Sequence, residues 1–392
     1  MLNQVPFIDI AYDPTVAYDD LPLLPPSLPP VAVGNTVVKN QLETVPLLKA
    51  CITARVLLAE LNVRASVFSS QQLLQRVFPL MEAHANASLD GVSTPIEVLF
   101  RLPAADEIAD HQRSPAIDHV LAIDRALANG FAATTNKPLD ISLLLDLATD
   151  INGKPESLRR GAPTASGQLE NYLPPCGAET LQRLLLNWQE FVRVDAGSLD
   201  PLIIMAVAHY QLNVIQPFNS GNDAVVRLVD SLLMSDELLI DRPLLNLSAW
   251  YRRNRAEYLR LQVAVTQQQC WHEWIEFVLR GVAECAQLAL KRLQVIETLR
   301  AQTESEVRRT LPRQFSAELI ELLFEEPCIR IQDLVRRGIA KRQTASVYLK
   351  KLCDQGILTE ITQGKEKLFL HTRLIRVLTN DTFQYESFSS EF

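Results

Sequence analysis

The sequence predicts an all-α protein that ends in a winged helix-turn-helix. Three observations favour this fold class. Leu is abundant whereas only 13 of the 392 residues are Gly, a composition that favours helices. Apolar residues recur at helical spacing along most of the chain. Near the C-terminus, three short helical segments precede a stretch whose pattern is typical of strand, turn and strand.

Composition and charge limit the function classes. Hydrophobic residues make up 47% and charged residues 21%, so the chain can bury a core. The net charge of −8 excludes a general nucleic-acid binder. The stretch from Cys328 to Leu378, however, holds 11 Lys and Arg against 4 Asp and Glu, a balance of +7. Such an asymmetry is typical of a nucleic-acid module attached to an acidic body.

The first 34 residues are rich in Pro and predict an extended arm. The helical pattern starts near Pro46, which suits a first turn, and runs to Leu61. Residues 152–177 hold many Gly and Pro and predict a long loop or hairpin of the kind that carries function. Residues 200–214 are apolar nearly all round, which predicts a helix in the middle of a bundle. The other helices expected in the body cover 70–86, 94–102, 114–129, 140–148, 178–192, 223–239, 248–269 and 270–302.

The C-terminal pattern predicts helices over 317–324, 330–337 and 341–353 and strands over 358–362 and 368–371. The third helix would be a recognition helix whose first residues meet base edges, while Lys and Arg meet phosphates. Because some winged helices bind proteins instead, a protein-interaction module is the alternative. The DNA-binding candidates on this helix and on the wing are Lys341, Arg342, Gln343, Thr344, Lys350, Lys365 and Lys367.

The segment from Gln216 to Arg227 reads QPFNSGNDAVVR and joins two predicted helices. Free backbone N–H groups and the positive dipole end at a helix N-terminus make an anion site, usually for phosphate. Arg227 lies one turn into the second helix, where it would reach the same anion. A plain helix connection is the alternative.

This segment resembles the Fic family motif HPFxxGNGRxxR, with matches at Pro217, Phe218, Gly221, Asn222 and Arg227. Helices with similar sequences flank the motif, and the stretch Tyr172, Leu173, Pro174 resembles the family's hairpin flap that docks the target peptide. The resemblance implies a Fic-type helical bundle with a small β-hairpin flap and a C-terminal winged helix. It also implies transfer of AMP from ATP to a hydroxyl of a target protein, with Ser220, Gly221, Asn222 and Arg227 binding the nucleotide.

The resemblance also predicts how the chain is divided. The expected parts are a Pro-rich arm (1–34), an N-terminal helical region with an inhibitory helix (35–110), a Fic core (111–305), a winged-helix domain (310–380) and a tail (381–392).

Four functional positions depart from the family pattern. Gln216 replaces the His that acts as general base, and an amide cannot accept the proton. Ser220 replaces the acidic ligand of Mg²⁺, Asp223 the second Gly, and Ala224 the first Arg. We therefore expect lost or much reduced catalysis in a nucleotide-binding or DNA-associated regulatory protein. An active adenylyltransferase, or a related nucleotidyl or phosphoryl transferase with altered chemistry, is the alternative.

Many Fic proteins carry an inhibitory helix whose Glu pairs with the last motif Arg. The matching stretch here is Asn86–Gly91, with Asp90 in place of the Glu and Gly91 after it. The sequence leaves open whether Asp90 pairs with Arg227 or makes no contact with it. His209, by contrast, lies on the buried helix and is expected to be a core histidine with its hydrogen bonds satisfied.

The resemblance implies ATP and Mg²⁺ as cofactors, although the replaced residues weaken both expectations. The partners expected are an unidentified protein target, DNA through the winged helix, and a second copy of the chain in a homodimer. No stretch of 18 apolar residues suggests a membrane span, and no signal peptide is apparent. The six cysteines form no CxxC pair and are expected to be buried free thiols, as in a cytoplasmic protein.

Overall fold

The computed structural model describes residues 5–6, 32–33, 36–37, 42–103, 108, 112–135, 138–161, 172–194, 199–268, 270–364 and 366–383. The predictions for most of the Pro-rich arm, most of the C-terminal tail, the middle of the flap and Lys365 lie outside these residues.

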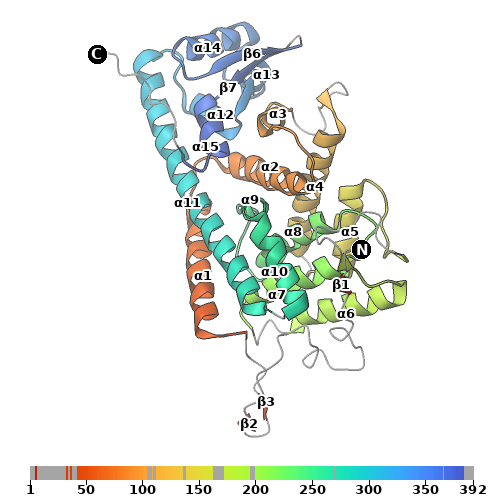
Figure 1. Cartoon of the computed structure of the whole chain (residues 1–392). Coiled ribbons are helices and arrows are strands. Elements are labelled where there is room, and N and C mark those ends of the chain that lie inside the picture. Colours follow the sequence, from red (N-terminus) through yellow and green to blue (C-terminus); the bar gives the residue numbers. More distant parts are fainter. Residues whose placement is uncertain are drawn as a thin grey trace. The chain divides into compact units, whose positions relative to one another are not determined.

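Helices dominate the described residues (Figure 1). The helices are α1 (Val45–Ser66), α2 (Gln71–Leu89), α3 (Ile96–Phe100), α4 (Pro115–Thr134), α5 (Ile141–Asn152), α6 (Ala178–Val194), α7 (Pro201–Ile215), α8 (Asn222–Asp236), α9 (Leu247–Arg253), α10 (Arg255–Gln268), α11 (Trp271–Thr310), α12 (Ala317–Glu325), α13 (Ile331–Arg336), α14 (Arg342–Asp354) and α15 (Thr372–Thr379). The strands are β1 (Val5–Pro6), β2 (Ala32–Val33), β3 (Thr36–Val37), β4 (Tyr172–Leu173), β5 (Cys328–Arg330), β6 (Thr359–Gln363) and β7 (Glu366–Leu370). The predicted all-α class is confirmed.

Two compact units make up the chain. The first comprises Met1–Ala59, Glu82–Ser93 and Asp118–Ala286, and the second comprises Glu60–Met81, Thr94–Ile117 and Gln287–Phe392. Helices α1, α2 and α11 each contribute residues to both units.

The first unit is built around α7, which is buried along almost its whole length, as its uniformly apolar sequence predicts. The Asp200 side chain caps the helix by accepting a hydrogen bond from the Leu202 N–H, and Pro201 occupies its first turn. Helices α6 and α8 pack against α7. The indole N–H groups of Trp188 and Trp274 donate to the carbonyls of Ala208 and Ala206, which fixes α7 within the unit.

The second unit contains the C-terminal elements, which lie together at the blue end of the chain in Figure 1. Strands β5, β7 and β6 form an antiparallel sheet in that order, and β6 and β7 are the two strands of the predicted wing. The sequence did not reveal β5 or α15. Arg330 was expected to start a helix, but it is the last residue of β5, and Asp333 caps α13 by accepting from the Arg330 N–H at 2.7 Å. His371, expected in a strand, instead caps α15.

Two predictions about the first unit need correction. The single helix expected over 248–269 is interrupted at Asn254, whose side-chain amide donates to the Trp250 carbonyl at 3.1 Å. The chain therefore forms α9 and α10 instead. The flap strand β4 pairs in parallel with β1, so Tyr172 and Leu173 have a strand partner from the start of the chain. A hairpin within the flap stays a prediction, because residues 162–171 lie outside the described part.

The cysteines and the helices can also be compared with what the sequence predicts. The described cysteines are free, as expected, but only Cys51, Cys285 and Cys328 are buried, whereas Cys176 is exposed. In the part of the chain that the structure covers, no helix is both long and apolar enough to cross a membrane.

Candidate functional site

The turn between α7 and α8 holds the motif residues in a strained backbone that Arg159 supports. Gln216 ends α7 in the left-handed region at φ 47°, which side chains with a Cβ rarely adopt. The buried Arg159 guanidinium donates to the Gln216 carbonyl at 2.5 Å and to the Ile215 carbonyl at 3.0 Å. The Arg159 N–H donates to the Pro217 carbonyl at 3.0 Å. The three successive carbonyls of residues 215–217 thus all accept hydrogen bonds from one residue.

Arg159 also ties this turn to the two ends of the flap segment. Its guanidinium donates to the carbonyls of Gly161 and Pro175, both at 2.6 Å. The described flap residue Pro174 is buried next to this anchor. One cation therefore holds the ends of the flap and the motif turn in a fixed geometry.

The second half of the turn is closed by two asparagines. The Asn222 side chain accepts from the Phe218 N–H and donates to the Phe218 carbonyl, both at 2.8 Å. Gly221 has φ 75°, and a Cβ there would lie 3.2 Å from the Asn152 side-chain oxygen. Asn152 in turn donates to the Ser220 carbonyl and accepts from the Ser220 hydroxyl. The predicted residues Ser220, Gly221 and Asn222 are thus held together in one rigid loop.

The Gln216 side chain is buried, with 2% of its surface exposed. Within the described part of the chain, its amide oxygen has no hydrogen-bond partner. A buried unpaired acceptor costs about 1–3 kcal/mol, and an amide oxygen cannot act as a general base near neutral pH. The side chain at this position of the motif therefore offers no basic nitrogen.

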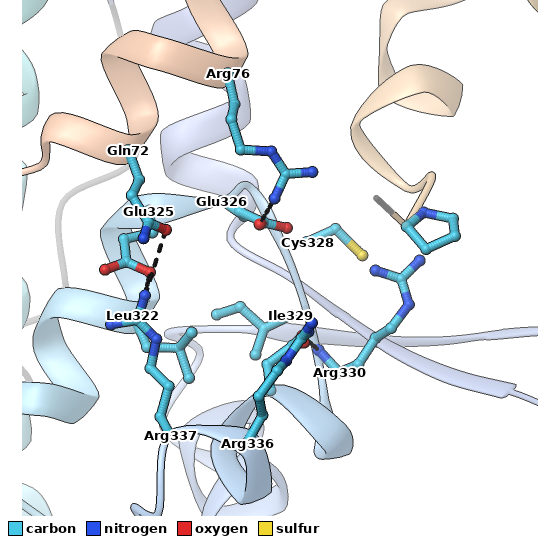
Figure 2. A pocket seen from close by; sticks show the side chains of 12 residues that line it. Gln72, Arg76, Leu322, Glu325, Glu326, Cys328, Ile329, Arg330, Arg336 and Arg337 are labelled. Atoms are coloured by element: carbon cyan, nitrogen blue, oxygen red, sulfur yellow. Dashed lines mark hydrogen bonds and ion pairs between the residues drawn. The ribbon is translucent and has the colours of Figure 1, made fainter. Parts of the chain in front are cut away.

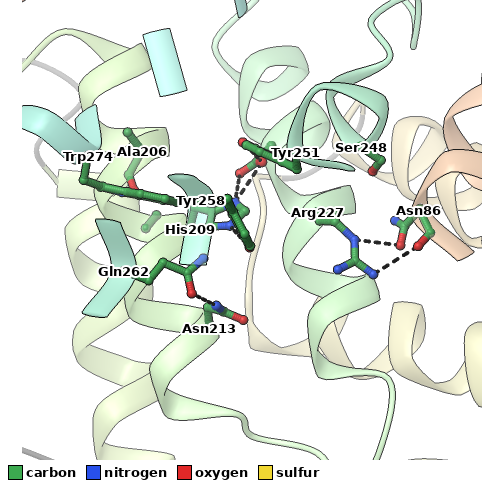
Figure 3. A network of polar contacts seen from close by, with 12 residues as sticks. Asn86, Ala206, His209, Asn213, Arg227, Ser248, Tyr251, Tyr258, Gln262 and Trp274 are labelled. Carbon is green, nitrogen blue, oxygen red and sulfur yellow. Dashed lines mark hydrogen bonds and ion pairs between the residues drawn. The ribbon is translucent and has the colours of Figure 1, made fainter. Parts of the chain in front are cut away.

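His209 cannot take over that role. Its Nδ1 lies 2.9 Å from the Asp230 carboxylate and its Nε2 lies 2.9 Å from the Tyr258 hydroxyl. Tyr251 donates to Asp230 at 2.8 Å, and His209, Tyr251 and Tyr258 lie together in Figure 3. All four side chains are buried. The prediction of a satisfied core histidine is confirmed.

Arg227 is buried and lies against the end of α2. Its Nε donates to the Asn86 side-chain oxygen at 2.9 Å (Figure 3), and its Nη2 donates to the Asp90 carboxylate at 2.6 Å. Gly91, at φ 83°, ends the helical turn directly after Asp90. Of the two alternatives left open by the sequence, the ion pair between Asp90 and Arg227 is the one present.

Charges around Arg227 keep its guanidinium protonated. Burial lowers the pKa of Arg227, but Asp90 and Asp223 raise it by more, so the net shift is upward. The nearby Glu82 carboxyl is also buried and accepts hydrogen bonds from the N–H and the hydroxyl of Ser248 at the start of α9. Burial raises the pKa of Glu82 to about 7, although Ser248 and Arg227 oppose the shift.

The site does not fit Mg²⁺. Among the described residues, no group of three or more His, Cys, Asp or Glu is placed to hold a metal ion. The Ser220 hydroxyl, at the position of the family's acidic ligand, donates to Asn152 at 3.2 Å. A hard dication prefers carboxylate oxygens, and the loop offers none at this position.

The DNA-binding candidates are on the surface of the second unit. The start of α14 exposes four of them in a row, which are Lys341, Arg342, Gln343 and Thr344. Lys350 is also exposed, further along the same helix. Lys367 on β7 is different, because its ammonium group pairs with Glu360 on β6 at 2.5 Å. The structure thus brings four candidates to one exposed turn and neutralises another.

A cavity of about 240 Å³ lies within the second unit, among α2, α12, β5 and α13 (Figure 2). Arg76 pairs with Glu326, Arg337 with Glu325, and Arg336 with Asp333. An anion would have to displace one of these carboxylates in order to bind. Burial raises the pKa of the Cys328 thiol in the cavity wall to about 12, so this thiol stays protonated.

Sequence reasoning missed Arg159, Asn152 and Glu82. Arg159 and Asn152 act from the Gly- and Pro-rich interval, where no hydrophobic period marks a position. Glu82 lies one turn before Asn86 on α2, so its spacing from Asn86 and Asp90 was the signal that could have indicated a polar stripe.

Comparison with known proteins agrees with this architecture. Residues 299–374 match the family model described as "Protein adenylyltransferase SoFic-like, C-terminal domain". A Fic family protein from Desulfovibrio desulfuricans is similar over 82% of this chain and 95% of its own, with a TM-score of 0.51 and 15% sequence identity. A Fic domain containing signaling protein from Bacteroides thetaiotaomicron is similar over 62% of this chain and 97% of its own, with a TM-score of 0.50 and 15% identity. At such identities the structural likeness concerns the fold. The chain therefore has the Fic fold, and its C-terminal region is similar to the C-terminal domain of SoFic-like adenylyltransferases.

Proposed function

We propose that this Fic-like protein has lost efficient AMP transfer and acts as a nucleotide-binding or DNA-associated regulatory protein. The observation that carries the proposal is the buried Gln216 at the position of the general base. Loss of a general base alone costs about 10²–10⁴-fold in rate. The absence of a carboxylate at Ser220 removes a further electrostatic contribution to catalysis.

The nucleotide part of the proposal rests on Arg227. Its guanidinium is buried and charged, and within the described residues its Nη1 has no hydrogen-bond partner. Asp90 occupies Nη2 and Asn86 occupies Nε. A triphosphate would have to compete with Asp90 for this cation, so we propose that Asp90 holds the site in a weakly binding state. Tyr172, Leu173 and Pro174 keep their proposed role in docking a target peptide.

Asp90→Asn separates binding from catalysis. In calorimetric titration with ATP, we expect the variant to bind about tenfold more tightly than the wild type, because the released guanidinium makes a charge-assisted contact with phosphate. With labelled ATP and Mg²⁺, neither protein should transfer label to itself or to a cell extract at an appreciable rate. Transfer at a catalytic rate would support the alternative of an active transferase. Equal ATP affinities would contradict the role proposed for Asp90.

DNA association is a second proposed function, favoured by the exposed first turn of α14. Four polar or basic side chains follow one another there, in a stretch with a balance of +7. Duplex DNA carries closely spaced phosphates. Lys and Arg side chains at such a turn would contact these phosphates and release the counterions bound to the DNA. The paired Lys367 contributes less, because Glu360 already neutralises it.

We expect the double variant Lys341→Ala and Arg342→Ala to bind duplex DNA more weakly and to lower the salt slope of log K by about 2. Fluorescence anisotropy at several salt concentrations measures this slope. The matched control replaces Arg252 and Arg253, two adjacent exposed cations on α9, and should leave the slope unchanged. An unchanged slope in the α14 variant would indicate that the region binds protein rather than DNA.

A further inference from the structure

Helix α1 has a second apolar face that its own chain leaves exposed. Its first face is buried in the protein through residues such as Leu47, Leu58 and Leu61. Exposed branched side chains mark the opposite face. They are Val45 (66% exposed), Ile52 (61%), Val56 (61%) and Val63 (65%). Four large apolar side chains in such positions on one helix are unusual for a surface that only meets water.

The four side chains form one straight stripe. At about 100° per residue, they fall within an arc of about 40° around the helix axis, and they extend over about 27 Å. Their spacings of seven, four and seven residues are those of a helix that packs along another helix. The stripe lies on a single continuous helix, Val45–Ser66.

The stripe is symmetric about its own middle. Val45 and Val63 lie equally far before and after Ala54, and so do Ile52 and Val56. Two charged residues border the stripe, and both are exposed: Lys49 in the first half and Glu60 in the second. In an antiparallel pair of these helices, Val45 of one copy faces Val63 of the other, Ile52 faces Val56, and Lys49 lies beside Glu60.

We propose that this face of α1 is a homodimer interface in which the α1 helices of two copies pack antiparallel around a two-fold axis. An isologous contact requires a surface that is complementary to itself, and this pattern meets that condition in both shape and charge. In a parallel pair, the flank that carries Lys49 and Glu60 in one copy lies on the opposite side of the interface from the same flank of the other copy, so this charge pairing would not form. An unrelated partner would not require the opposite charges to lie at nearly equal distances from the middle of the stripe.

Sedimentation velocity on the full chain tests the interface. We expect the wild type to sediment as a dimer at micromolar concentrations, and Ile52→Asp to raise the dimer dissociation constant by at least 30-fold. Because Ile52 is exposed in the single chain, its replacement should leave the circular dichroism melting curve of the monomer unchanged. Leu186→Asp, at an exposed apolar residue on α6, is the matched control and should not change the dissociation constant.

Charge exchange tests the direction of the helices. Lys49→Glu should weaken the dimer, because the introduced carboxylate of each copy would then lie beside Glu60 of the other. The double variant Lys49→Glu with Glu60→Lys should restore the dimer. A wild type that stays monomeric at 100 micromolar would overturn the proposal, and so would a dimer that Ile52→Asp leaves intact. Failure of the double variant to restore the dimer would overturn the antiparallel arrangement. None of these outcomes depends on nucleotide or DNA binding.

Discussion

Arg227→Met should lower the free energy of unfolding of the first unit by about 3 kcal/mol. Removing one partner of a buried ion pair typically costs about 3–5 kcal/mol. Asp90 retains some contact with water, with 23% of its side chain exposed, so we expect the lower end of this range. The buried Asn86 loses the donor to its side-chain oxygen and adds to the loss.

Urea denaturation followed by tryptophan fluorescence measures this change, because all four tryptophans lie in the first unit. Arg227→Lys keeps the charge but loses the two-pronged donor geometry, so its stability should lie between those of Arg227→Met and the wild type. Arg252→Met, at an exposed arginine on α9, is the control and should change stability by less than about 0.5 kcal/mol. A similarly small change in Arg227→Met would mean that the pair contributes nothing to the fold.

Acidification should destabilise the second unit through His371. The imidazole is buried, and its Nδ1 accepts a hydrogen bond from the Leu374 N–H at the start of α15. Burial, with a smaller contribution from Arg373, lowers the pKa of His371 to about 3 from a usual value of 6.5. Between pH 3 and pH 6.5, His371 therefore binds a proton more readily in the unfolded chain than in the folded one. The stabilising contribution is complete above pH 6.5 and is lost as the pH falls toward 3, by about 4–5 kcal/mol in all.

His371→Asn tests this linkage. An Asn side chain can still accept the capping hydrogen bond from Leu374, but it does not bind a proton in this range. Urea unfolding followed by far-ultraviolet circular dichroism at pH 7.5 and 4.5 should show a large loss for the second unit of the wild type and a much smaller loss for the variant. Tryptophan fluorescence reports the first unit separately in the same samples. Parallel pH dependence in both proteins would contradict the assignment to His371.

The motif turn could be predicted from the sequence because its residues are close together and of special types. Gly221 and Asn222 mark the turn, Arg227 lies one helical turn later, and the structure joins them as expected. The pairing of Asp90 with Arg227 spans 137 positions, so it depended on the family resemblance rather than on spacing. Helix starts agreed more closely than helix ends: the helix expected over 270–302 begins at Trp271 but runs on to Thr310.

The parts that could not be predicted have no periodic pattern. Arg159 acts through backbone carbonyls that any sequence would offer, so its residue type alone carried no signal. Asn254 interrupts a helix by a local side-chain contact, and β5 has only three residues, too few to show alternation. The burial that lowers the pKa of His371 arises from tertiary packing, including its edge contact with Phe324.

Glu82, Asn86 and Asp90 lie on successive turns at the end of α2, and each bonds to the body of the first unit. Their common spacing of four residues means that a small rotation of this segment about its axis would separate all three from their partners together. All three side chains accept hydrogen bonds from donors, so sliding by one turn would reverse no polarity but would leave the donors at one end of the row without an acceptor. The three contacts at this end of α2 are therefore released together when the segment turns.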